Sequence, residues 1–316
     1  MNHVLLWVAF NVFVLVVLAL DLGIFHRNAR PIHMKEALVW SVIWTAAAFV
    51  FNGLIYWWWD SEAAVAFLTG YVIERFLSMD NLFVFVLIFS YFNIPAKYQH
   101  KILFWGILGA LIMRAAFIFA GIALVEAFHW IMYVFGAFLI LAGIHTGLAK
   151  KEIHPEKNPV LKLLRRFVTC SDEDGSGKFF LKRNGRVCAT TMFIALVFVE
   201  VTDLVFALDS IPAILAITRD PFIVYTSNVF AILGLRALYF ALAAMMRLFH
   251  YLHYGLAAVL IFIGVKMLAS DLYKISVEIA LLVVTVILGG SVICSALFPP
   301  QTDSQPKREE SGKNSS

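Results

Sequence analysis

The chain has 316 residues, of which 61% are apolar and only 15% charged, and its mean hydropathy is +0.84. This small number of charged side chains cannot cover the surface of a soluble domain. The composition therefore excludes a soluble protein and predicts an all-α protein that crosses a membrane many times. The net charge of +4 comes without a basic cluster interleaved with aromatic residues, which argues against nucleic acid as a partner.

Apolar runs of about 20 residues, the length that a helix needs to cross a bilayer, are frequent along the chain. They predict about nine transmembrane helices, near residues 4–25, 37–59, 66–92, 102–125, 130–149, 189–217, 222–246, 253–270 and 276–298. The first run has no basic residue before it, and Arg27 and Arg30 come after it, which favours a retained helix over a cleaved secretory signal.

Lysine and arginine residues gather in alternate loops, and cytoplasmic loops are the ones that keep them during insertion. The opposite loops hold only Arg219 and Lys274. The basic set comprises Arg27, Arg30 and Lys35; Lys97 and Lys101; ten residues between 150 and 188; Arg247; and Lys307, Arg308 and Lys313 in the tail. We therefore predict that the N-terminus lies outside and the C-terminus lies in the cytoplasm.

A duplication is visible in the middle of the chain. Arg114 precedes Arg236 by 122 residues, and three further pairs are 121 residues apart, namely His129 and His250, Tyr133 and Tyr254, and Gly143 and Gly264. Each copy spans three helices, and an odd number of crossings inverts the second copy, as in many secondary transporters. The sequence thus predicts an inverted-topology duplication of three-helix units.

The expected organisation follows from this duplication. Two transmembrane helices in residues 1–65 precede the first three-helix repeat, and one transmembrane helix follows the second. We expect the repeats in residues 66–149 and 189–271, a cytoplasmic connector in 150–188, the last helix in 272–298 and a disordered cytoplasmic tail in 299–316.

Five carboxylates stand inside apolar stretches. The motif ERFLSMDN holds Glu74 and Asp80, and the motif EVTDLVFALDSIPA holds Glu200, Asp203 and Asp209. A charged side chain at the bilayer centre costs about 2.5 to 3.5 kcal/mol on insertion scales, so five such residues indicate a function. We expect them to line an ion path.

The two acidic helices can be aligned in two registers. An offset near 123 residues pairs Asp80 with Asp203. An offset of 129 requires a shorter loop in the second copy, and it pairs Glu74 with Asp203, Asp80 with Asp209, and Asn81 with Ser210. We prefer the second register, because it repeats one pattern of two acids followed by a small polar residue.

Two acids six residues apart point in directions about 120° from each other on a straight helix, so one face cannot present both. Pro212 removes the hydrogen bond to the Leu208 carbonyl and predicts a helix break beside Asp209. Unwound backbone next to carboxylates at mid-membrane is typical of cation sites in transporters.

The candidate ligands are hard oxygen donors, which suit magnesium, calcium or manganese. Zinc and copper fit poorly, because His145 is the one histidine well inside a predicted helix and no cysteine stands near the acids. Cys170, Cys188 and Cys294 lack CxxC spacing, and we expect them to be reduced. The metal would be cargo, and we expect no resident cofactor.

Arginines inside the predicted helices offer a competing interpretation. Arg75, Arg114 and Arg236 would neutralise three of the five acids and leave a stabilised bundle without transport. For Arg114 and Arg236 we favour ion pairing over contact with a substrate or gate.

Three segments resemble the TerC family of membrane proteins, in its bacterial Alx-like branch. They are GYVIERFLSMDNLFVFVLIFSYF, FFLKRNGRVCAT and VEVTDLVFALDSIPAILAITRDPFIVYTSNVFAILGLRALYF. The resemblance implies Mn²⁺ efflux across the bacterial inner membrane, a response to alkaline pH and, by older naming, tellurite resistance. It also implies that the five acids form the metal site. Buried carboxylates close together are expected to have raised, coupled pKa values, so an arriving metal would displace protons, which makes proton antiport the expected coupling.

Two alternatives of other classes stay open: an exporter of small organic solutes, and a membrane scaffold or stress sensor that transports nothing. We do not expect an enzyme, because the sequence shows no nucleophile and base pair and no cofactor motif. The oligomeric state is left open.

Overall fold

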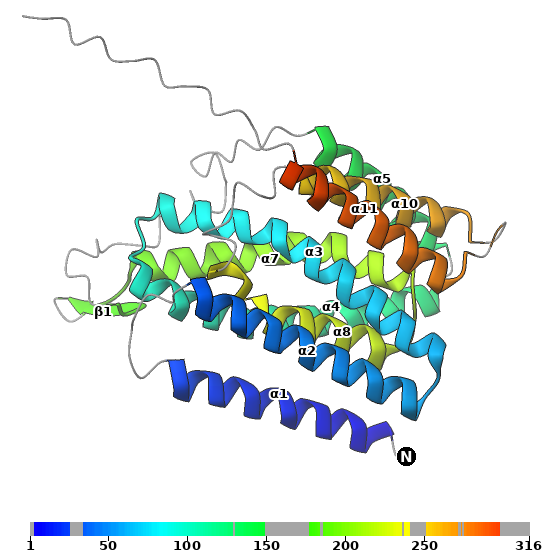
Figure 1. The fold of residues 1–316 in the computed structure, drawn as a ribbon. Coiled ribbons are helices and arrows are strands. Elements are labelled where there is room, and N and C mark those ends of the chain that lie inside the picture. The colour runs from blue at the N-terminus through cyan, green and yellow to red at the C-terminus, as the bar shows by residue number, and fades with distance from the viewer. Residues whose placement is uncertain are drawn as a thin grey trace, which may run out of the picture.

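The computed structural model describes residues 3–25, 34–128, 130–148, 177–183, 186–235, 237–240, 251–270, 273 and 275–297. Its helices run roughly alongside one another in one bundle (Figure 1). They are α1 (His3–Phe25), α2 (Met34–Trp58), α3 (Ser61–Tyr91), α4 (Ala96–Ala127), α5 (Ile131–Leu148), α7 (Thr191–Leu215), α8 (Pro221–Leu233), α10 (Leu252–Leu268) and α11 (Val277–Leu297). The predicted all-helical class is confirmed.

Five of these helices, α2, α4, α5, α7 and α11, are long and apolar enough to cross a membrane. Large apolar side chains cover the outside of the bundle: Val42, Ile112 and Val286 are 67%, 66% and 63% exposed. Such a surface suits lipid, because water would make its exposure unfavourable.

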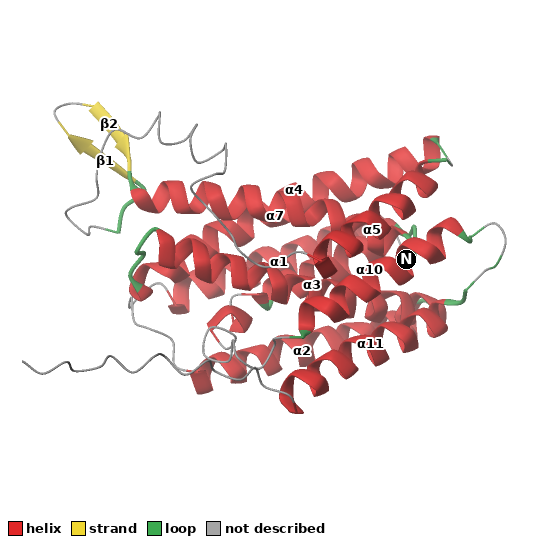
Figure 2. Ribbon diagram, turned by 90° about the horizontal axis from the view of Figure 1, so that it is seen from above, coloured by secondary structure: helices red, strands yellow, loops and turns green. Residues whose placement is uncertain are grey.

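The centre of the bundle is built from α3, α4, α7 and α8. Each of α3 and α4 packs against both α7 and α8. Helices α2 and α1 lie on one side of this centre, and α5, α10 and α11 lie on the other (Figures 1 and 2). Polar side chains that point between these four helices are therefore shielded from lipid.

The expected helix break at Pro212 is wrong for this conformation. Helix α7 continues through Pro212 to Leu215, and the Pro212 carbonyl still accepts the Ala216 N–H at 3.1 Å. Pro212 stands in the last turn of α7. The hydrogen bond to the Leu208 carbonyl is lost there, but only three helical residues follow, and packing can hold them in place.

The seventh predicted span, residues 222–246, is interrupted where no break was expected. Helix α8 ends at Leu233, Gly234 forms a turn, and residues 237–240 are helical again. A Cβ at position 234 would collide with the guanidinium of Arg75. The packing of Arg75 against this position therefore favours glycine. Glycine is a poor helix former, which is consistent with the interruption of the helix here.

Part of the expected connector is ordered as a hairpin. Strand β1 (Phe180–Arg183) pairs antiparallel with β2 (Arg186–Ala189) at one end of the bundle (Figure 2). The Lys101 ammonium of α4 donates to the Gly177 carbonyl at 2.8 Å and anchors the segment before β1. Cys188 in β2 is disulfide-bonded, which corrects the expectation of reduced cysteines, whereas Cys294 is free.

Candidate functional site

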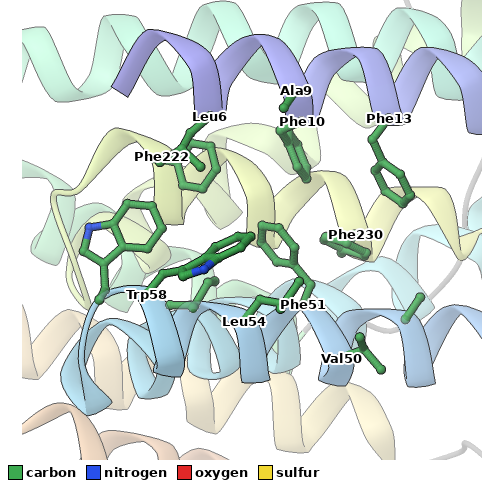
Figure 3. A pocket seen from close by; sticks show the side chains of 13 residues that line it. Leu6, Ala9, Phe10, Phe13, Val50, Phe51, Leu54, Trp58, Phe222 and Phe230 are labelled. Atoms are coloured by element: carbon green, nitrogen blue, oxygen red, sulfur yellow. The ribbon is translucent and has the colours of Figure 1, made fainter. Parts of the chain in front are cut away.

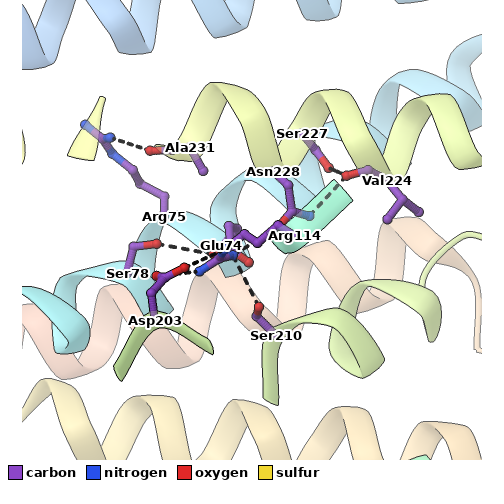
Figure 4. Close-up of polar contacts among 10 residues, drawn as sticks. All are labelled: Glu74, Arg75, Ser78, Arg114, Asp203, Ser210, Val224, Ser227, Asn228 and Ala231. Atoms are coloured by element: carbon purple, nitrogen blue, oxygen red, sulfur yellow. Dashed lines mark hydrogen bonds and ion pairs between the residues drawn. The ribbon is translucent and has the colours of Figure 1, made fainter. Parts of the chain in front are cut away.

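Arg114 is the centre of a polar cluster among the four central helices (Figure 4). It projects from the middle of α4 and is 2% exposed. Its Nε and Nη2 donate to the two carboxylate oxygens of Asp203 in α7, at 3.4 and 3.3 Å. Its Nη1 pairs with Glu74 of α3. One guanidinium therefore joins two acids that come from the two predicted repeats.

Neutral groups complete the shell around Arg114. Nη1 also donates to the Ser210 hydroxyl at 3.3 Å and to Asn228 Oδ1 at 3.1 Å. The Ser78 hydroxyl donates to Glu74 at 3.3 Å, from one turn further along α3. Glu74 and Asp203 are 2% and 4% exposed, so these charges are removed from solvent and must satisfy one another.

A small cavity of about 40 Å³ lies beside this cluster. That volume exceeds the roughly 10–15 Å³ that one water molecule needs. Four of its lining residues carry oxygen atoms that were predicted as ligands: Glu74, Asn81, Asp209 and Ser210. Thr146 of α5 adds a hydroxyl, and His145 lies close enough to Asp209 for an electrostatic interaction.

The remaining acids are distributed differently. Glu200 is half-buried in α7, and its carboxylate rests against Gly109 of α4. Glu200 lies within electrostatic range of Asp203 but outside the cavity lining. The side chain of Asp80 and all of Arg236 lie outside the described residues, so their predicted roles stay predictions.

Arg75 does not pair with an acid in the described part of the chain. Its Nη1 donates to the Ala231 carbonyl at 3.2 Å, and its Nη2 donates to the Ser41 hydroxyl at 3.1 Å. It thereby satisfies a backbone carbonyl at the C-terminal end of α8, where cations are favoured. Among the described residues, Arg114 makes the expected ion pairs and Arg75 makes none, so a charge-pairing or gating role for Arg75 stays a prediction.

An apolar cavity between α1, α2 and α8 has a different character. It measures about 440 Å³ and is lined by rings and aliphatic groups such as Phe10, Phe51 and Trp58 (Figure 3). It offers no carboxylate, so it does not suit a cation.

Among the described residues, no three His, Cys, Asp or Glu side chains converge closely enough to hold a metal ion. Arg114 gives the physical reason, because its guanidinium occupies the space between Glu74 and Asp203. The predicted ligands are thus neighbours, but in this conformation an arginine holds two of them.

The family model described as "Integral membrane protein TerC family" matches residues 59–303, a span that contains all five acids. The chain belongs to the TerC family. It is therefore an integral, multi-pass membrane protein, and the resemblance seen in its motifs is confirmed.

Two kinds of TerC relative are similar over nearly the whole chain. An uncharacterized membrane protein of Myxococcus xanthus, STKORF319, is 50% identical over 293 residues, which is 92% of each chain. Alx of Escherichia coli K12, named as a candidate membrane-bound redox modulator, is 43% identical over 312 residues, which is 95% of this chain and 97% of Alx. No solved structure gives a significant match.

Sequence reasoning missed Asn228, whose side chain accepts from Arg114 and donates from Nδ2 to the Val224 carbonyl at 3.0 Å. The signal was present, because Asn228 stands within the apolar segment PFIVYTSNVFAIL that became α8. A polar side chain at that depth in a membrane helix indicates an interior partner. In this TerC protein the partner is an arginine.

Proposed function

We propose that this TerC protein exports Mn²⁺ from the cytoplasm across the bacterial plasma membrane, with its N-terminus outside and its C-terminus in the cytoplasm. One observation carries the proposal. Glu74, Asn81, Asp209 and Ser210 line one small cavity between α3, α7, α5 and α10. Oxygen donors of this kind bind hard divalent cations, and the cavity walls supply no thiolate.

The site would use residues from both halves of the chain. Glu74, Asp80 and Asn81 come from α3, and Glu200, Asp203, Asp209 and Ser210 come from α7. The choice of manganese over magnesium or calcium rests on the TerC resemblance. Carboxylates that release protons when the metal arrives would couple export to proton entry, so proton antiport is the coupling that we propose.

An inverted repeat is part of this proposal, and helix packing supports it. The proposed symmetry relates α3 to α7, α4 to α8 and α5 to α10. Under that exchange the α3–α8 contact becomes the α7–α4 contact, and both are extensive. Gly136 approaches Gly264, while Gly143 approaches the Ala257 carbonyl. The offset of 121 residues converts the first of these contacts into the second, as a two-fold axis requires.

A second cavity, of about 730 Å³, lies where α3 and α11 begin and α10 ends. Glu62, Arg219, Lys266 and Glu278 line it. In the proposed orientation this is the outer face, so the cavity would serve as the mouth through which the ion leaves.

The test uses cells that lack their own manganese exporter and are loaded with Mn²⁺. We expect the wild-type protein to speed the loss of intracellular manganese, and the Asp80→Asn, Asp209→Asn variant to reduce it to the level of cells without the protein. Glu74→Gln should behave in the same way. Glu126→Gln is the matched control, because it makes the same change at the exposed end of α4 and lies outside the lining of both cavities.

The outcomes separate the candidates. Normal efflux by well-expressed Asp80→Asn, Asp209→Asn protein would refute the site. A scaffold or sensor, which suits the redox-modulator name of the Alx relatives, predicts no metal-dependent flux in proteoliposomes of the folded protein. An organic solute exporter predicts flux of that solute without manganese.

Gly109 allows the position of Glu200 to be tested apart from its charge. A Cβ at Gly109 would collide with the Glu200 carboxylate, which is the mobile end of a flexible side chain. We therefore expect Gly109→Ala to move that carboxylate at little cost in stability and to lower manganese efflux as much as Glu200→Gln does. Efflux and urea unfolding of both variants check this. Wild-type efflux by Gly109→Ala would mean that the location of Glu200 does not matter.

A further inference from the structure

Arg114 engages a carboxylate from each half of the chain at once. It binds Asp203 through two parallel N–H donors and Glu74 through a third nitrogen, Nη1. Its hydrogen-bond acceptors among the described residues are all oxygen atoms (Figure 4). A divalent metal in the small cavity would use Glu74, which lines it, and the proposed site adds Asp203, which is buried on the neighbouring helix α7.

Arginine and metal compete for these oxygens. An ion that binds Glu74 and Asp203 at the usual ligand distance of about 2.0 to 2.6 Å takes lone pairs that now accept from the Arg114 nitrogens. The two cations would also repel each other at low dielectric. Metal binding at Glu74 and Asp203 therefore requires the guanidinium to move away.

The shell offers Arg114 a place to go. Asn228 Oδ1 accepts from Nη1 at 3.1 Å, and the Asn228 amide nitrogen is committed to the Val224 carbonyl. That second bond fixes which end of the amide faces Arg114. Asn228 belongs to α8, not to the two acid-bearing helices, so it stays available when the acids are taken.

We infer that Arg114 is an internal substitute for the metal: it pairs with Glu74 and Asp203 and offsets one of their two negative charges when the site is empty, and it moves toward Asn228 when Mn²⁺ binds. This inference rests on the proposed function. It assigns Arg114 a role in the return of the empty carrier, because unpaired acids could not change sides of a low-dielectric bundle without a large cost. The arginine would offset one negative charge, and the protons of the proposed antiport would neutralise the remaining acids.

The inference is tested with purified protein, MnCl₂ and two variants that act in opposite directions. Arg114→Lys keeps the charge but loses the fork that grips two carboxylates, so it competes less well. We expect it to bind Mn²⁺ about tenfold more tightly than wild type, a difference of about 1.4 kcal/mol. Asn228→Leu removes the acceptor for the displaced arginine and should weaken binding. Electron paramagnetic resonance of free Mn²⁺ measures both affinities.

Transport gives the second readout. In proteoliposomes, Arg114→Lys should retain Mn²⁺/Mn²⁺ exchange but lose most net efflux, since only net efflux needs the empty carrier to return. Arg75→Lys is the matched control, because the partners of Arg75 among the described residues are a carbonyl and a hydroxyl. It should leave affinity within about twofold of wild type.

The results distinguish a failure of this inference from a failure of the proposed manganese export. Folded Arg114→Lys that binds Mn²⁺ no more tightly than wild type, or that loses exchange and net efflux equally, would show Arg114 to be structural and leave the export proposal standing. Wild-type protein that neither binds nor exchanges Mn²⁺ would overturn both.

Discussion

Replacing Gly264 by valine will separate α5 from α10 and destabilise the folded protein by roughly 3 kcal/mol, the upper end of the usual range for overpacking. A Cβ at Gly264 would lie 2.6 Å from the Gly136 carbonyl oxygen and 3.1 Å from the Ile140 nitrogen. Both are backbone atoms of α5, which cannot rotate aside as a side chain can. Close backbone approach of this kind holds membrane helices together where the hydrophobic effect cannot.

The measurement is urea or dodecyl sulfate unfolding of the purified protein in detergent. Gly290→Val is the matched control, because a Cβ at Gly290 in α11 meets nothing within 4 Å. Equal unfolding midpoints for the two variants would contradict the proposed packing. The same comparison bears on the inverted repeat, since Gly143→Val should resemble Gly264→Val if the two glycines are equivalent.

The helices were predictable because membrane length imposes a simple pattern on the sequence. The predicted span at 4–25 became His3–Phe25, and the span at 276–298 became Val277–Leu297. The length of an apolar run directly gives the approximate length of the membrane helix, so neither prediction needed knowledge of neighbouring helices. Charged ends extended others: α4 begins at Ala96 although its apolar run begins near residue 102.

Irregularities of the helices were less predictable, because packing decides them. Pro212 lowers helix propensity but stands in the last turn of α7, where the helix tolerates it. Gly234 carries a weaker local signal, yet α8 stops before it, where the Arg75 guanidinium lies against Gly234 and donates to the Ala231 carbonyl. Local propensity predicts that proline interrupts a helix more strongly than glycine does. In this protein the interruption lies at the glycine, where a tertiary contact is made, and the helix continues through the proline.

The hairpin was missed although its signal was local. FFLKRNGRVCAT places an Asn-Gly pair between two short segments, the strongest short-range indication of a hairpin. The segment was interpreted only as a connector. Its strands, Phe180–Arg183 and Arg186–Ala189, lie beside the starts of α4 and α7.

The site was predicted in part. Both acidic motifs can be recognised in the sequence, because carboxylates inside apolar runs are energetically costly. Four of the predicted ligands line one cavity. Which arginine pairs with which acid could not be read from the sequence. Arg75 adjoins Glu74 in the chain, yet Arg114, forty residues away, makes the ion pair. Adjacent residues on a helix point in different directions, so the choice depends on how α3 and α4 pack.

Replacing Arg114 by methionine will destabilise the protein more than replacing either acid by its amide. The cluster contains two buried acids and one buried cation. Without the cation, Glu74 and Asp203 face each other unpaired, and breaking a buried pair in this way costs about 3–5 kcal/mol. Glu74→Gln or Asp203→Asn leaves Arg114 with one acid and one amide oxygen, so each should cost less. Unfolding of the three variants in detergent measures the order.

The triple variant Arg114→Met, Glu74→Gln, Asp203→Asn makes the comparison decisive. It removes all three charges and leaves no uncompensated ion, so it should recover much of the stability that Arg114→Met alone loses. A triple variant no more stable than the single one would show that the guanidinium stabilises by shape and hydrogen bonding instead of charge. A stable triple variant without manganese efflux would mean that the bundle can fold without these charges, and that transport is the reason it keeps them.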